Sequence, residues 1–166
     1  DSLSSALLFL EILAEKKDLL AYLNQIYLKY GLYRESLYSL TLEGSTGQAK
    51  IKQSIENLRT KDLLGLKIGD RVVESVLDYG TLTAKGKAKT SIFKGMPKSN
   101  VIQLELSGNA KLTIRPSGTE PKVKVYSSFR ALFTIKKESE ISANWTSLGD
   151  EINNAEKEFL KLAGLL

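Results

Sequence analysis

The sequence predicts an α+β fold in which helices come first and an antiparallel sheet follows. Apolar residues recur at helical spacing in the first third of the chain, and after Gly65 their period falls to two. Segments with this shorter period lie near residues 72–77, 101–106, 112–114 and 123–125. We therefore expect a four-stranded antiparallel sheet with helices, preceded by a mostly helical segment.

Three helices are expected before this sheet. Asp1 or Ser2 is placed to cap the first helix, and Asp18 can cap a second helix that Gly31 ends. A short strand around residues 38–42 comes next.

Ser45 and Gln48 then have the spacing of a capping box for a third helix. A last helix is predicted from about Ser147, as its cap, to Ala163. Ser107-Gly108-Asn109 is a natural hairpin turn within the sheet. We place a boundary near residues 61–66 and expect it to act as a hinge.

Composition limits the classes of function. The formal net charge is +5 and the pI is about 9.3, which favours anionic partners such as phosphorylated metabolites, nucleic acid or acidic surfaces. Cysteine and histidine are both absent, so the chain has no thiolate metal site and lacks the commonest general base. No apolar run approaches the ~20 residues that span a bilayer. Because the chain starts at Asp1 and enters a helix at once, we interpret it as a piece of a longer protein.

The segment from Lys85 to Lys98 carries five lysines and two glycines. A nucleic-acid patch is one interpretation. However, Phe93 is its only aromatic residue, and bases usually stack on more than one ring. A solvated, mobile loop is therefore the favoured interpretation.

The polar turn at residues 115–122 suits an oxyanion. Arg115 supplies a planar fork of donors, and Ser117 and Thr119 add hydroxyl groups on either side of Gly118. Gly118 has no side chain, so backbone N–H groups can approach a ligand closely. Two prolines fix φ at the shoulders of the turn. The alternative is an ordinary hairpin turn that only reverses the chain.

The alternation of side chains along a strand predicts which way the charged residues around this turn point. Arg115 is opposite in parity to the apolar residues before it, which directs it away from the core. Lys122 and Lys124 should share one strand face, where they either are solvated or add to the positive potential. Glu120 would be repelled by a phosphate, so we expect it to turn away and pair with one of these lysines.

Residues 115–122 resemble, almost letter for letter, the phosphate-binding loop of the α-D-phosphohexomutases, the phosphoglucomutase/phosphomannomutase family. Weaker similarity at residues 1–8, 27–33, 66–79 and 97–101 follows the order of the same family.

The resemblance implies a domain organisation. Residues 1–63 would be the C-terminal part of the family's α/β third domain. Residues 64–166 would be its fourth domain, a TATA-binding-protein-like antiparallel sheet with helices that binds phosphate.

The resemblance also implies an activity for the parent protein. The enzymes of this family are isomerases, namely intramolecular phosphotransferases of carbohydrate metabolism. Their phosphoserine exchanges its phosphoryl group with a hexose 1-phosphate or 6-phosphate. Mg²⁺ supports the transfer, and hexose 1,6-bisphosphate is the activator and intermediate. Arg115, Ser117, Gly118 and Thr119 would contact the phosphate that does not react. The nucleophile, the metal ligands and the sugar-recognition loop would lie outside this chain, which alone should be inactive.

The expected partner is a hexose phosphate in the cytoplasm, without nucleic acid or a membrane. The apolar face of the first helix, with Leu3, Leu7 and Leu10, should be left without its packing partner and allow self-association. A non-catalytic sugar-phosphate module or a nucleic-acid-binding module stays open as the alternative function.

Overall fold

The computed structural model describes residues 1–166, with the exception of the Ser45 side chain. Four α-helices, seven strands and two short 3₁₀ turns follow one another along the described chain. They are α1 (Ser2–Lys16), α2 (Leu19–Tyr30), β1 (Tyr33–Thr41), α3 (Gly44–Thr60), β2 (Lys67–Ile68), β3 (Arg71–Asp78), β4 (Thr83–Gly86), η1 (Thr90–Phe93), β5 (Ile102–Leu106), β6 (Ala110–Pro116), β7 (Lys122–Arg130), η2 (Glu138–Glu140) and α4 (Ile141–Ala163).

The strands form one antiparallel sheet in the order β1-β7-β6-β5-β3-β2, and β4 pairs with β3. The α+β class and the four expected strands, which correspond to β3, β5, β6 and β7, are confirmed. The short strand expected around residues 38–42 is β1, which is longer than expected and adds an edge to the sheet next to β7. The short β2 and β4, which pair with β3, were not predicted. The hairpin turn between β5 and β6 is also as expected, with Gly108 and Asn109 at positive φ.

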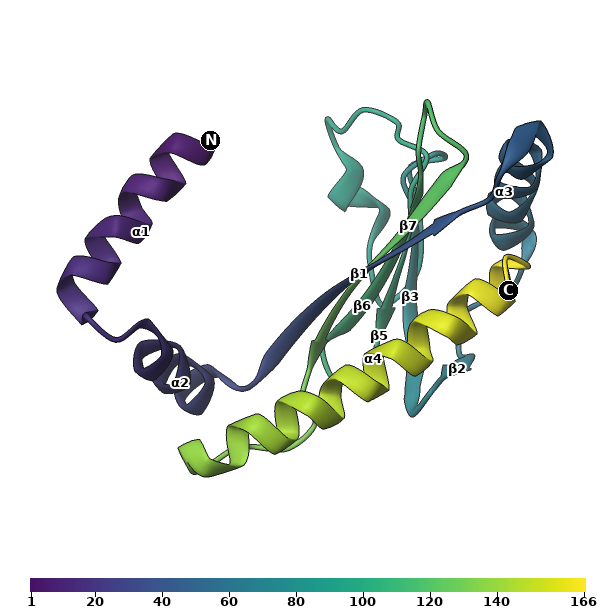
Figure 1. Ribbon diagram of the computed structural model, residues 1–166. Coiled ribbons are helices and arrows are strands. Elements are labelled where there is room, and N and C mark those ends of the chain that lie inside the picture. The colour runs from purple at the N-terminus through teal and green to yellow at the C-terminus, as the bar shows by residue number, and fades with distance from the viewer.

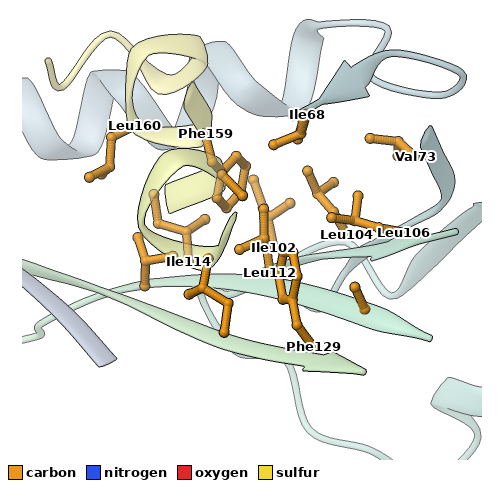
Figure 2. Close-up of a cluster of buried hydrophobic side chains, with 14 of the residues drawn as sticks. Ile68, Val73, Ile102, Leu104, Leu106, Leu112, Ile114, Phe129, Phe159 and Leu160 are labelled. Carbon is orange, nitrogen blue, oxygen red and sulfur yellow. The ribbon is translucent and has the colours of Figure 1, made fainter. Parts of the chain in front are cut away.

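Helices α3 and α4 pack against one face of the sheet and enclose the core (Figure 1). Strand residues on this face are buried, among them Leu104, Leu112 and Val125. Figure 2 shows Phe159 and Leu160 of α4 directed towards these strands. Both side chains are fully buried. Alternation with period two therefore separates a core face from an open face, as strand geometry requires.

The helix starts differ in how well the sequence predicts them. The carboxylate of Asp1 accepts hydrogen bonds from the N–H of Leu3 and Ser4, and that of Asp18 accepts one from Ala21, so both caps are confirmed. Helix α3 starts at Gly44 with Glu43 as its N-cap, and the capping box expected from Ser45 lies outside the described side chains.

The prediction that Ser147 caps the last helix is wrong. Helix α4 begins six residues earlier, at Ile141. Its first turns are held by tertiary contacts, because the Arg34 guanidinium donates to the Trp145 carbonyl and the Trp145 ring packs against Tyr27. A local capping pattern does not contain these contacts.

The lysine-rich segment is attached to strand β3. The N–H of Lys87 donates to the Glu74 carbonyl, and that of Ala88 donates to the Ser75 hydroxyl. Phe93 is buried and lies edge-to-face against Tyr79, with 5.1 Å between the ring centroids. The five lysines are exposed, as expected, but the segment that carries them is anchored by its one aromatic ring.

The hydrophobic core continues across residues 61–66, so the expected hinge is not supported. Ile51, Ile55 and Leu58 of α3 share one core cluster with Leu63 within this segment and with Ile68 beyond it. The assignment of residues 1–63 and 64–166 to two domains of a parent stays a prediction, but β1 and α3 pack with the sheet.

Helix α1 stands away from the sheet in Figure 1, and it has no buried residue. Leu3, Leu7 and Leu10 keep between 57% and 75% of their surface exposed. Within the described part of the chain, no helix has the length and apolarity needed to cross a membrane.

Candidate functional site

The connection between β6 and β7 is a tight loop, residues 117–121, held by its own backbone. The Ser117 N–H donates to the Lys122 carbonyl over 2.7 Å, and the Lys122 N–H donates to the Glu120 carbonyl over 2.7 Å. The Ser117 hydroxyl oxygen accepts from the Glu120 N–H over 3.3 Å. Since this hydroxyl is used as an acceptor, its proton remains available to donate to a ligand.

Two cations lie side by side where the loop joins the sheet. Arg115 on β6 is the direct register partner of Lys124 on β7, so both side chains project from the open face. Among the described residues, neither forms an ion pair with a carboxylate. Like charges directly opposite each other on adjacent strands are unfavourable. A bound anion would neutralise this pair.

All four residues predicted from the sequence meet at one hollow of about 300 Å³ on the open face. Arg115, Ser117, Gly118 and Thr119 line it together with Lys124 and Tyr126. Gly118 presents bare backbone here, since a Cβ atom added to it would meet no other atom within 4 Å. The hollow thus combines a guanidinium, an ammonium, two hydroxyls and accessible backbone, which is donor chemistry for an oxyanion.

Glu120 takes the place that its chemistry predicts. Its carboxylate accepts from the Lys122 ammonium, with 3.2 Å between Nζ and Oε2, and it does not line the 300 Å³ hollow. The expected pairing with one of the two lysines is therefore confirmed. Lys122 is occupied by this pair, whereas Lys124 is directed to the hollow.

Lys124 and Tyr126 were not among the predicted site residues. Strand alternation placed Lys124 on one face with Lys122, but it could not show which residue of β6 stands opposite. That information is the register between β6 and β7, which the structure provides.

A second hollow, of about 490 Å³, lies on the other side of the same loop, between the loop and α3. Gln48, Ala49, Ile51, Lys52 and Asn100 line it opposite the loop. It is the larger of the two, but it has one lysine and also contains Glu120. The hollow with Arg115 and Lys124 is better suited to an anion, because it holds two cations and no carboxylate.

The residues described by the structure do not fit a metal ion. In that part of the chain, no three Asp, Glu, His or Cys side chains are grouped closely enough to hold one. We therefore derive no chemical step through a metal in this chain.

Comparison with curated proteins finds phosphoglucomutases. Over 112 residues the chain is 37% identical to the phosphoglucomutases of Staphylococcus aureus strains MRSA252 and USA300, and 36% identical to that of strain MSSA476. Each match covers 65% of this chain and 19% of the relative, so the chain spans about a fifth of the relatives' length. No family model matches the chain. The resemblance to phosphohexomutases is confirmed as homology to phosphoglucomutase.

Proposed function

We propose that this homologue of phosphoglucomutases is the C-terminal part of a phosphohexomutase, and that it binds the phosphate of a hexose phosphate that does not react. The observation that best supports this proposal is the meeting of Arg115, Lys124, Ser117 and Thr119 at one hollow. The unit that carries the site is the sheet with α3 and α4.

The chemistry of the hollow explains how it would hold a phosphate. Arg115 would form two parallel hydrogen bonds to a pair of phosphate oxygens. Lys124 would add a point charge, and the Ser117 and Thr119 hydroxyls and loop N–H groups would donate to the remaining oxygens. Since the bound phosphate does not react, its binding energy is available to align the sugar for transfer elsewhere in the parent.

We further propose that the parent interconverts hexose 1-phosphate and 6-phosphate through a phosphoserine, in cytoplasmic carbohydrate metabolism. Hexose 1,6-bisphosphate would serve as its activator and intermediate. We propose that the phosphoserine and the ligands of Mg²⁺ come from residues of the parent outside this chain.

A titration with inorganic phosphate tests the site. Amide signals of residues 117–119 are followed by NMR in the wild type and in Arg115→Ala. A charged hydrogen bond contributes about 1.5–3 kcal/mol, so we expect phosphate to bind Arg115→Ala roughly tenfold to a hundredfold more weakly. Glucose 6-phosphate should shift the same signals.

The matched control is Lys157→Ala, which also removes one positive charge. Lys157 is exposed on α4, the helix that packs against the core face of the sheet. This variant should bind phosphate like the wild type. Equal affinity of wild type and Arg115→Ala would contradict the assignment. A steep salt dependence with oligonucleotides, and no response to phosphate, would favour a nucleic-acid-binding module instead.

A further inference from the structure

Helix α3 approaches the end of strand β1 very closely at one point. Gly47, near the start of α3, is buried against Leu42. A Cβ atom added at position 47 would collide with the Leu42 carbonyl oxygen and would lie 2.7 Å from its carbonyl carbon and 2.9 Å from its Cβ. Two of these three atoms belong to the backbone, so a larger residue would have to displace the chain at Leu42. Glycine is otherwise unfavourable inside a helix, which indicates that this close approach is the reason for its presence.

Leu42 in turn holds the candidate loop. Its N–H donates to the carbonyl of Pro121 over 2.9 Å. Among the described residues, this is the one hydrogen bond that reaches residues 117–121 from outside the β6–β7 hairpin. On its α3 side the loop borders the 490 Å³ hollow, which leaves space behind much of it. The Leu42–Pro121 bond is therefore the loop's main external support.

We infer that Gly47 is a positioning residue for the anion-binding loop and that it acts through Leu42 and Pro121. Any side chain at position 47 would push the Leu42 backbone and carry the Pro121 carbonyl with it. Pro121 directly precedes Lys122, whose carbonyl accepts from Ser117 and closes the loop. Displacement would thus reach Ser117, Gly118 and Thr119. That the loop's ligand is a phosphate rests on the proposed function.

The first test is Gly47→Ala, with inorganic phosphate as the probe and the amide signals of residues 117–121 as the readout. We expect these signals to shift even without phosphate, and the phosphate dissociation constant to rise roughly tenfold, the effect of losing one well-placed charged hydrogen bond. The control is Leu58→Val, which removes one buried methylene from the other end of α3. It should lower the melting temperature but leave phosphate affinity and the loop signals unchanged.

A second variant removes the same support without filling the space at Gly47. Leu42→Pro deletes the N–H that donates to Pro121, and it should weaken phosphate binding as Gly47→Ala does. Its control is Glu43→Pro. Glu43 has a φ of −67°, which proline adopts, and among the described residues its N–H donates to no backbone carbonyl. This control should bind phosphate normally.

Normal phosphate affinity and unchanged loop signals in Gly47→Ala and Leu42→Pro would overturn the inference. If Gly47→Ala does not fold, the phosphate affinity of Leu42→Pro, compared with that of Glu43→Pro, tests the inference on its own. Failure of the wild type to bind phosphate would overturn the proposed function. The loop signals of the two variants would still confirm or overturn the positioning role.

Discussion

Replacement of Arg71 by methionine should destabilise the fold more than any change to an exposed charge. The Arg71 side chain is 1% exposed. Its Nε donates to the Glu151 carboxylate over 2.5 Å, and its terminal nitrogens donate to the carbonyls of Ser107, Gly108 and Arg130 over 2.8–3.2 Å. The guanidinium also lies over the Phe129 ring, with 4.8 Å between the guanidinium carbon and the ring centroid. This one side chain therefore joins β3, the β5–β6 turn, the end of β7 and helix α4.

The expected cost follows from what the substitution leaves behind. Removal of one partner of a buried ion pair typically costs about 3–5 kcal/mol, because the other charge stays without compensation. Glu151 retains 25% exposure of its side chain, so water can solvate it in part, and we expect the lower end, about 3 kcal/mol. For a chain of this size each kcal/mol lowers the melting temperature by about 2–4 °C, which gives a decrease of about 6–12 °C.

Chemical and thermal denaturation followed by circular dichroism measure this cost. The matched control is Lys87→Ala, which breaks the exposed Lys87–Glu74 pair, also anchored on β3. An exposed pair contributes at most about 1 kcal/mol, so this variant should unfold within a few degrees of the wild type. A loss below about 1 kcal/mol in Arg71→Met, equal to that of the control, would refute the idea that the buried clamp holds these elements together.

Three further outcomes are expected. Lys124→Ala should weaken phosphate binding in the NMR titration by roughly tenfold, whereas Lys122→Ala should have a smaller effect because Glu120 already engages that lysine. Equal effects of the two variants would contradict the expectation that Lys124 contacts the phosphate and Lys122 does not. The chain should associate in sedimentation experiments as its concentration rises, and Leu7→Lys combined with Leu10→Lys on α1 should return it to a monomer; a wild type that stays monomeric would argue against association through this helix. The purified chain should not convert hexose 1-phosphate to hexose 6-phosphate in a coupled assay, and genuine turnover would show that the nucleophile lies within these residues.

The sequence alone was sufficient for features that depend on neighbouring residues. Asp1 and Asp18 cap their helices through contacts within one turn, and a cap is recognisable in any context. Period-two alternation directed Arg115 away from the core, because successive side chains of a strand always alternate between its faces. The composition of residues 115–122 predicts an oxyanion site for the same local reason, and this site stays a prediction.

Tertiary structure decided whatever depends on residues far apart in the chain. Lys124 joins the candidate site because the register of β6 and β7 sets it opposite Arg115, and a shift by one residue would turn it to the other face. The first turns of helix α4, which the sequence did not predict, are packed through Trp145 against Arg34 and Tyr27, more than a hundred residues away in the sequence.

The support of the loop is the clearest case. Nothing near Gly47 in the sequence marks it as related to Ser117, since an isolated glycine in a helix reads as a weak point. Leu42 is close to Gly47 in the sequence, but only the fold brings Leu42 against Pro121. The donor groups of residues 115–122 are thus a property of one short segment, while the approach of Lys124 and the support of the loop depend on pairing and packing between elements that the sequence separates.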